Sequence, residues 1–546
     1  MKKLYYEKIK NFLGKYLFIL FLCALLNFLF LQLVLKNGLT GDDWQLLFEY
    51  KTTPEPLNRI LDIWMMKGPY VTVYLYYIGT LEKLFGLNYQ LFQIINICLK
   101  IFASITLFLL ISKIFKDRFL ASISMVIFSI IHSSAGVLSY VVKGTEYLAI
   151  GFMNLFFLYY YKSVIENSIM LTFFTSIILF LTFMLSPIRI YPLFGLIFLI
   201  EVYLVIKIKK FIFLSQSLVR LSIFFLPMLI LTRASIGRTS GYFDSIIRFI
   251  SDFKNDTLYY LLSWFKALGY SLLGNHQLVF LHSPAFLVGI SILICSAICF
   301  IIWIRNGSKL DKLFLLFFGP WFAFLFIIST GAVLGRTFNI IESMHWYLII
   351  PSLGISIFIS ALISLLIEQG VKLKRYVYLL VAFLLFMTVA LISHYEITQH
   401  FNSLLSLGTG ADDQSYMQNQ ILNSINNQNQ VDLIIYMDLS TDQGLTQYHA
   451  VASNLGYLPQ WLLYFKKPEF LGCIAVITDK KNLQESFKQK ELEHFEANGF
   501  CAQTRYNIGM VRTVYETRDF RAFRLKDKKI FNITDQILQE LRSKKI

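Results

Sequence analysis

Eleven apolar segments, separated by more polar stretches of different lengths, run through the first 395 residues of this chain. A bilayer requires roughly 20 apolar residues for each helical span, and backbone groups inside it must be bonded within a helix or a closed barrel. The segments are approximately 16–35, 91–111, 119–131, 147–161, 169–185, 190–206, 218–231, 285–304, 313–330, 346–367 and 376–393. The pattern predicts an α-helical polytopic membrane protein with about eleven transmembrane helices.

Composition and charge support this fold class. Hydrophobic residues make up 56% of the 546 residues and charged residues 15%, whereas soluble domains have about 45–50% and about 25%. The formal net charge of +16 is typical of nucleic-acid binding, but much of the Lys and Arg lies in short loops between the apolar segments. Basic loops of that kind set membrane topology, so no nucleic-acid partner is expected.

The positions of the basic residues predict the orientation of the chain in a cell membrane. Lysines precede the first apolar segment, which places the N-terminus in the cytoplasm, and eleven spans then place the C-terminus outside. Region 233–283 is interpreted as one outer loop with a membrane-surface helix, because a span there would move the basic loop 305–312 outside. Residues 70–86 are interpreted as an interfacial or half-inserted helix.

The sequence becomes polar after residue 395. Short apolar runs at 431–436 and 473–477 predict buried strands, and 415–426 and 481–498 predict helices. The expected organisation is a transmembrane catalytic domain over 1–395 and a small extracytoplasmic α/β domain over 396–546. The six cysteines follow no metal-binding or redox spacing. Cys473 and Cys501 could form a disulfide if this domain is outside the cytoplasm, and the sequence leaves their pairing open.

An acidic pair, Asp42-Asp43, follows the first apolar segment directly and precedes Trp44. Two carboxylates at the mouth of a span are costly unless they face water or a cation. The pair is interpreted as a chemical centre, and the alternative is a cap at the start of a short helix. Paired carboxylates also bind hard divalent cations, but no third ligand is recognisable nearby beyond Glu49, Glu55 and Asp62. No cofactor is expected, and a divalent metal at Asp42 and Asp43 is the alternative that is not favoured.

Further charged residues are predicted to face the same side as the acidic pair. Carboxylates can act as general bases, and Arg, Lys and His can hold a phosphate and stabilise it as it leaves. The alternative is that these residues are scattered interface anchors. The candidate substrate-binding residues are His132, Lys143, Glu146, Arg189, Arg238, Arg336, Glu342 and His345, with Lys67 as a further outer cation.

Residues 15–395 resemble the GT-C class of polytopic glycosyltransferases, nearest to the membrane portion of tetratricopeptide-linked O-mannosyltransferases and their bacterial relatives. The resemblance rests on an ordered series of weak motifs: Asp42-Asp43, Gly68-Pro69, Leu84-Phe85-Gly86-Leu87, Asn96, residues 128–149, residues 186–193 and residues 342–354. This chain departs from the family pattern in several places. Gly68 replaces the family's Arg, Ser133 replaces its Pro, and Pro187-Ile188 replaces its Lys-Glu pair. The histidines that the family has around Asn96 are missing, with Gln93 and Lys100 in that neighbourhood, and no tetratricopeptide tail is present.

The resemblance implies an extracytoplasmic active site that takes a polyprenyl-phosphate sugar from the bilayer. Asp43, or else Asp42, would deprotonate the acceptor hydroxyl, which attacks the anomeric carbon with inversion. The acceptor stays open between a protein, a glycan and a lipid. The first alternative is a lipid or solute transporter or flippase, which predicts charges inside the spans, whereas here they are expected at the outer ends. The second is an assembly protein in which the C-terminal domain binds the partner.

Overall fold

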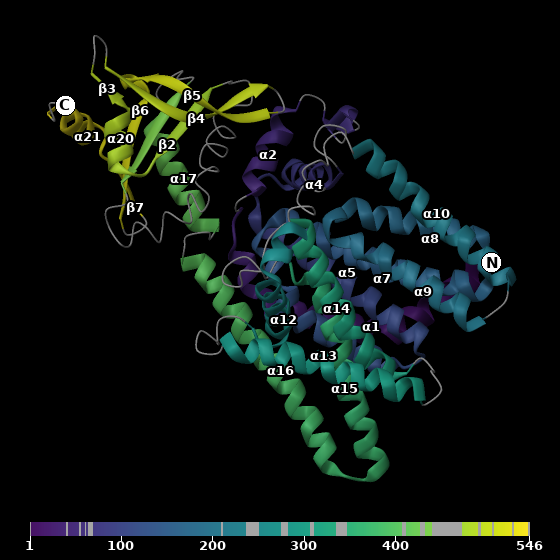
Figure 1. Ribbon diagram of the computed structural model, residues 1–546. Coiled ribbons are helices and arrows are strands. Elements are labelled where there is room, and N and C mark those ends of the chain that lie inside the picture. Colours follow the sequence, from purple (N-terminus) through teal and green to yellow (C-terminus); the bar gives the residue numbers. More distant parts are fainter. Residues whose placement is uncertain are drawn as a thin grey trace.

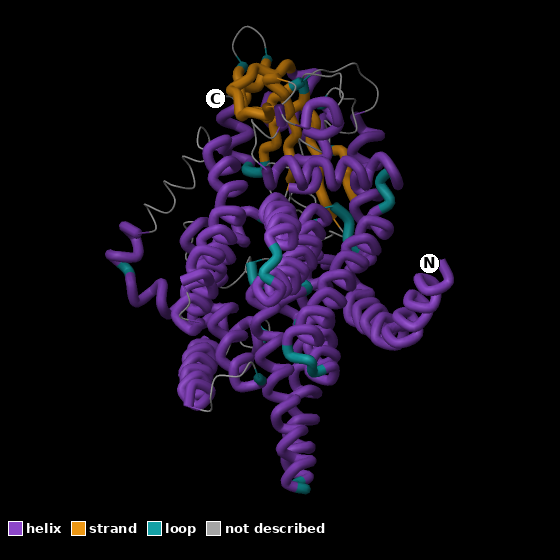
Figure 2. Tube along the Cα trace, turned by 90° about the vertical axis from the view of Figure 1, so that its right-hand side faces the viewer, coloured by secondary structure: helices purple, strands orange, loops and turns teal. Residues whose placement is uncertain are grey.

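The computed structural model describes most of the chain, and its elements form a helical body and a small sheet domain (Figure 1). The described residues are 2–39, 42–53, 56–60, 62–63, 69–208, 211–235, 250–274, 282–305, 311–334, 347–406, 411–425, 432–438, 472–489, 493–504, 507–526 and 529–543. Figure 2 shows the strands gathered at one end of the molecule, with helices making up the remainder.

The helical body contains the elements that coincide with the predicted apolar segments. Its long helices are α1 (Lys2–Leu31), α5 (Tyr89–Ile114), α6 (Arg118–Ile130), α7 (Thr145–Glu166), α8 (Ile169–Leu185), α9 (Pro187–Ile208), α10 (Phe211–Ser235), α12 (Thr257–Leu273), α13 (His282–Arg305), α14 (Lys312–Leu334), α15 (Ile349–Leu373) and α16 (Tyr376–Ser406). Among the described residues between the first apolar segment and α5 lie the helices α2 (Asp42–Thr52) and α4 (Pro69–Phe85).

Within the described residues, seven helical segments are long and apolar enough to cross a membrane by length and composition. They are Leu17–Lys36, Tyr89–Ile114, Val141–Glu166, Ala285–Arg305, Lys312–Thr330, Ile349–Leu373 and Tyr376–Leu405. The remaining predicted spans fall on the shorter apolar helices Arg118–Ile130, Ile169–Leu185, Pro192–Ile206 and Leu214–Leu226. The fold class is therefore a helical membrane protein, and the number of eleven spans stays a prediction.

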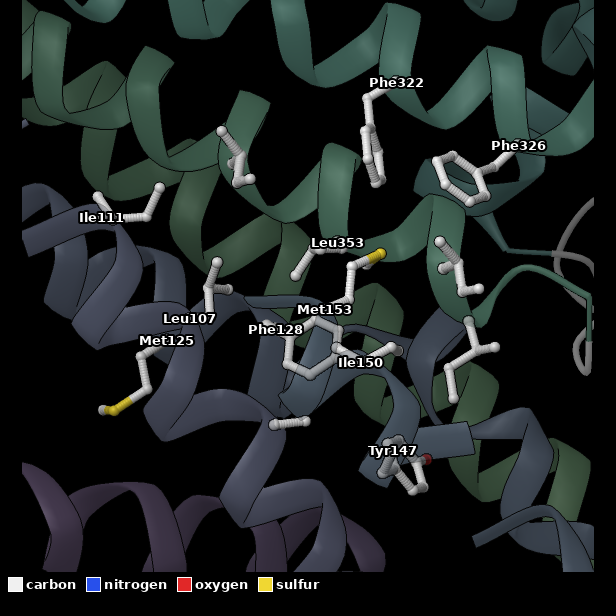
Figure 3. Packing of buried hydrophobic residues seen from close by; sticks show 14 of the residues in the cluster. Leu107, Ile111, Met125, Phe128, Tyr147, Ile150, Met153, Phe322, Phe326 and Leu353 are labelled. Atoms are coloured by element: carbon white, nitrogen blue, oxygen red, sulfur yellow. The ribbon is translucent and has the colours of Figure 1, made fainter. Parts of the chain in front are cut away.

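The centre of the helical body is closely packed. Figure 3 shows Leu107 and Phe128 from α5 and α6 meeting Ile150 of α7, with side chains of α14 and α15 on the other side. The backbones of α14 and α15 approach closely at Gly319 and Gly354. The approach is so close that a Cβ atom on either residue would overlap the carbonyl oxygen of the other. Small residues allow such contacts between apolar helices.

Helix α12 differs from the expectation of a membrane-surface helix. It packs antiparallel against α13, since Gly269 lies against the Ala285 carbonyl and Gly289 against the Phe265 carbonyl. Its side chains Tyr260, Trp264, Ala267 and Leu268 are buried in the same cluster as residues of α13, α14 and α15. Small residues at the contact bring α12 into the body, and hydropathy alone did not reveal this contact.

The C-terminal sheet has the strand order β3-β4-β2-β1-β6-β7, with β5 paired to β4. The strands are β1 (Leu433–Asp438), β2 (Cys473–Ile477), β3 (Phe487–Lys488), β4 (His494–Thr504), β5 (Asn507–Glu516), β6 (Phe520–Lys526) and β7 (Lys529–Asn532). The central strand β1 is parallel to β2 and to β6, and the other pairings are antiparallel. All six residues of β1 are buried, as expected for a strand covered on both faces.

Helices cover both faces of this sheet. Helices α20 (Lys480–Ser486) and α21 (Thr534–Ser543) pack on one face. On the other face, Ile421 and Ile425 of α17 (Ala411–Ile425) join side chains of β1 and β2. The same cluster contains Trp44 of α2 and Leu75 of α4, so the sheet domain and the segment after the first span share one hydrophobic core.

In the C-terminal region, two predicted strands and one predicted helix are confirmed, and the pairing of two cysteines, which the sequence left open, is observed. Strands β1 and β2 and helix α17 lie where the sequence predicts two strands and a helix. Cys473 and Cys501 form a disulfide and stand opposite each other on the antiparallel strands β2 and β4. The predicted domain boundary after residue 395 falls within α16, which is continuous to Ser406.

The predicted helix at 481–498 is wrong beyond Ser486, where α20 ends. Strand β4 begins at His494 and pairs with β5 along its length. Phe495 is fully buried and stacks on Phe520 with ring centroids 4.6 Å apart. Non-local pairing and burial thus outweigh the helical preference of the local sequence, as they commonly do.

Candidate functional site

Residues 131–144 form a buried loop inside the helical body, which we call the buried loop. It begins where α6 ends and consists of three short 3-10 turns, η3 (His132–Ser134), η4 (Gly136–Ser139) and η5 (Val141–Gly144). Nearly all its residues are buried. Backbone groups away from water require partners, and non-helical backbone at membrane depth is tolerated only where protein or a water-filled cavity surrounds it.

One face of α5 supplies partners for the carbonyl groups of this region. Gln93, Asn96 and Lys100 are all fully buried, and their spacing of three and four residues places them on the same side of the helix. Their bonds are Gln93 Nε2 to Leu138 O (3.3 Å), Asn96 Nδ2 to Val141 O (3.1 Å) and Lys100 Nζ to Ser129 O (2.9 Å). Ser129 lies in the last turn of α6, where carbonyls lack helical partners, so the amine of Lys100 caps that end.

Asp43 supplies partners for the N–H groups of the loop. Its Oδ2 accepts the N–H of Val141 and its Oδ1 accepts the N–H of Val142, both at 3.0 Å. The side chain is fully buried, and hydrogen bonds to an ionised acceptor are among the stronger ones. Asp43 therefore fastens the start of α2 to the buried loop.

Two tyrosines of α4 close the site from another side. The Tyr77 hydroxyl donates to Asn96 Oδ1 at 2.5 Å, and the Tyr74 hydroxyl donates to Glu146 Oε1 at 2.5 Å. Burial raises the pKa of Tyr77 well above its usual range, and the charge of Asp43 raises it further. Tyr77 therefore stays a neutral hydrogen-bond donor beside the Asp43 carboxylate.

Lys143 and Glu146 lie at the junction of the buried loop with α7. The Lys143 ammonium is 4.5 Å from the centroid of the Tyr74 ring, a cation–π geometry. Glu146 is buried and also accepts the Ser186 hydroxyl at 2.5 Å. Since Ser186 separates α8 from α9, Glu146 joins the turn before Arg189 to the loop that carries Lys143.

The structure brings together Asp43, Lys143 and Glu146 among the predicted site residues, through contacts with the buried loop and α4. His132 lies at the other end of the loop, where its Nε2 is 3.0 Å from the Tyr270 carbonyl oxygen and its backbone N–H donates to Ser393 Oγ. The predicted residues Lys67, Arg238, Arg336, Glu342 and His345 lie outside the described residues, as do the side chains of Asp42 and Arg189. In the part of the chain that the structure describes, no group of three or more His, Cys, Asp and Glu residues could hold a metal ion.

Sequence reasoning missed the polar face of α5. In the sequence, Gln93 and Lys100 stand out only as departures from a family pattern, although polar residues at helical spacing within an apolar segment indicate a buried polar contact. This pattern predicts that one face of the helix forms hydrogen bonds with other segments inside the helical body.

A second polar cluster lies within the apolar helices, against the expectation that charges gather at the outer ends. Glu201 of α9 accepts Arg220 Nε at 2.7 Å and Arg220 Nη2 at 2.8 Å. The same carboxylate accepts the hydroxyls of Tyr160 and Ser217. Both charged side chains are almost fully buried, so the ion pair is complete and joins α7, α9 and α10.

Comparisons with known proteins add little to this picture. No family model matches the chain, and no curated protein matches it. Among solved structures, it is similar to the Archaeoglobus fulgidus oligosaccharyltransferase, crystallised with a tethered acceptor peptide containing the NVT sequon, at 13% identity and a TM-score of 0.35. The alignment covers 81% of this chain and 64% of that enzyme, so the chain spans less than two thirds of its length. A TM-score of this size does not establish a shared fold.

Proposed function

We propose that the protein is a membrane glycosyltransferase that transfers a sugar from a polyprenyl-phosphate donor to an acceptor hydroxyl on the extracytoplasmic face. The observation that carries the proposal is the bond between Asp43 and the buried loop. It joins the acidic segment after the first span to the segment that carries Lys143 and Glu146, about 100 residues later. An acid–base residue and a phosphate-binding cation are the two groups that this transfer requires.

In this mechanism the acceptor oxygen attacks the anomeric carbon while the bond from that carbon to the phosphate oxygen breaks. The acceptor proton passes to a carboxylate, the lipid phosphate leaves with the bonding electrons, and the anomeric centre inverts. Lys143 is proposed to bind the leaving phosphate as a point charge. Arg189 and the other outer cations are proposed to assist it.

We assign the base to Asp42 and a positioning role to Asp43. A general base has to come within hydrogen-bond reach of the proton that it accepts. The Asp43 carboxylate is 0% exposed, and each of its oxygens already accepts a backbone N–H. Of the two carboxylates, Asp42 is therefore the one proposed to meet the acceptor.

The disulfide between Cys473 and Cys501 supports an extracytoplasmic C-terminal domain. Disulfides persist in oxidising compartments and are rare in the cytosol. The domain shares a hydrophobic cluster with α2 and α4, which is consistent with a site on the same side of the membrane.

The test is transfer by purified protein with radiolabelled polyprenyl-phosphate sugars and a panel of peptide, glycan and lipid acceptors. Asp42→Asn is expected to lower the transfer rate about 10²–10⁴-fold with unchanged thermal stability, the usual contribution of a positioned base. Asp412→Asn, an exposed carboxylate in the first turn of α17, is the matched control and should retain activity. If Asp42→Asn transferred sugar at the wild-type rate, the assignment of Asp42 as the base would be wrong. If the wild-type protein gave no labelled product with any donor, the proposed function would be wrong.

A transporter is the second candidate, and the buried charges of Glu201, Arg220 and Lys100 inside the apolar helices favour it. Intramembrane ionisable residues often mark transport pathways. The Glu201–Arg220 pair is fully bonded, however, and Lys100 caps a helix end, so both have a structural explanation. Flux of a polyprenyl-phosphate sugar across vesicles that persists in Asp42→Asn and stops in Glu201→Gln would favour the transporter.

A further inference from the structure

The peptide units around Val141 are held from two opposite directions by residues of different helices. The Val141 N–H donates to Asp43 Oδ2 of α2, and the Val141 carbonyl accepts Asn96 Nδ2 of α5. Asn96 Nδ2 is also 3.3 Å from Gln93 Oε1, and its own carbonyl oxygen accepts the Tyr77 hydroxyl. The Asn96 amide therefore uses both its donor and its acceptor sides in a fully buried position.

The backbone of Gly144, three residues after Val141, packs directly against the same Asn96 side-chain amide. A Cβ atom built on Gly144 would overlap Asn96 Oδ1 and lie 3.0 Å from the Tyr77 hydroxyl oxygen. Asn96 thus contacts both ends of the turn η5: it donates to the Val141 carbonyl and packs against the Gly144 backbone. Lys143 lies between these two contacts in the sequence.

We propose that Asn96 is a positioning residue that fixes Lys143 in place to receive the phosphate of the lipid-linked donor, an inference that rests on the proposed function. Asn96 acts through Lys143 and does not itself touch the donor. Tyr77 orients the Asn96 amide by donating to its oxygen, and Tyr74 receives the Lys143 ammonium on its ring face. The chemical group recognised is a phosphate on a lipid chain, which is a diester in the sugar donor and a monoester once the sugar has been transferred.

A binding experiment separates this role from a general contribution to stability. The probe is polyprenyl phosphate in detergent. Inorganic phosphate is tested in parallel, to distinguish recognition of a lipid-linked phosphate from recognition of the free anion. Asn96→Ala is expected to weaken polyprenyl-phosphate binding about tenfold, the size expected from one misplaced charged contact. In a double-mutant cycle with Lys143→Ala the effects should be non-additive, because Asn96 acts through Lys143.

The matched control is Asn154→Ala. Asn154 is another fully buried asparagine in the helical body, and its Nδ2 bonds to the Ala103 carbonyl and to Thr106 Oγ1, away from the buried loop. It should lower thermal stability to a similar extent and leave polyprenyl-phosphate binding unchanged. Tyr77→Phe removes one hydroxyl and serves as the milder variant if Asn96→Ala does not fold.

A second readout does not depend on the ligand. In a Lys143→Cys protein whose four free cysteines are replaced by serine, the rate of labelling by a water-soluble maleimide reports the position of residue 143. Asn96→Ala or Tyr77→Phe should change this rate about threefold or more, as expected for local opening, and Asn154→Ala should not.

The two readouts distinguish the failures. Labelling unchanged from the Asn154→Ala control, or additive binding losses in the cycle, would overturn the role of Asn96. If the wild-type protein binds no polyprenyl phosphate while Asn96→Ala still changes labelling, the proposed function fails and the positioning of residue 143 stands.

Discussion

Asp43 and Glu201 are both buried in the helical body, and the protein stabilises the two carboxylates in different ways. Glu201 meets a full opposite charge, Arg220, and two hydroxyls within the apolar helices. Asp43 lies at the start of α2, and the bonds described for it are two backbone N–H groups of the buried loop. The ion pair joins helices, whose backbone groups bond within each helix. The carboxylate of Asp43 instead accepts backbone N–H groups of a loop that lies outside any α-helix.

The comparison separates two uses of a buried charge. An ion pair and apolar side chains of similar volume give similar stability in many proteins, so such a pair alone says little about function. An acceptor that satisfies adjacent N–H groups of a loop determines where that loop lies. The Asp43 contact therefore fastens the turn that carries Lys143 to α2, while the Glu201 contact joins α7, α9 and α10.

The largest effect is expected when the ion pair is broken on one side. Arg220→Ala leaves the Glu201 carboxylate buried without its cation, which costs about 3–5 kcal/mol in comparable pairs. Thermal unfolding of the purified protein in detergent measures the loss. Replacing both partners, with Glu201→Leu and Arg220→Met, should recover most of the stability. A double variant as unstable as Arg220→Ala would show that the charges themselves are required.

The sequence predicts the helical segments well because apolar composition over about 20 residues is a local property. It also places Asp43 and Lys143 in segments of the chain that meet in the structure. The partners of these residues depend on non-local contacts, since Asn96 and the Val141 carbonyl belong to different elements. The same limit explains the wrong helix after Ser486, where pairing of β4 with β5 decides the structure.

A smaller loss is expected when the Asp43 anchor is weakened. Asp43→Asn keeps the shape but places an amide donor against a backbone N–H, so one of the two bonds is lost together with the charge. The expected cost is about 1.5–3 kcal/mol, the usual range for a hydrogen bond to a charged group. Thermal unfolding and the maleimide labelling rate of residue 143 should both change. Arg220→Ala should lower stability more than Asp43→Asn and change the labelling rate less, and the reverse order would invalidate the distinction between the two carboxylates.

The smallest effect concerns another carboxylate, Asp519 in the sheet domain. Burial raises the pKa of Asp519, while the Glu516 N–H, which donates to its Oδ2 at 3.1 Å, acts in the opposite direction. A raised pKa means that the folded state holds the proton more tightly than the unfolded state, so ionised Asp519 opposes folding at neutral pH. This penalty is relieved as the pH falls through the folded pKa towards the ordinary value of about 3.9.

Asp519→Asn should therefore be slightly more stable than the wild type at pH 7, by less than about 1 kcal/mol, and the advantage should shrink on acidification. Melting curves of the two full-length proteins between pH 7 and about pH 4 measure this difference, and an advantage that grows on acidification would contradict the assigned sign.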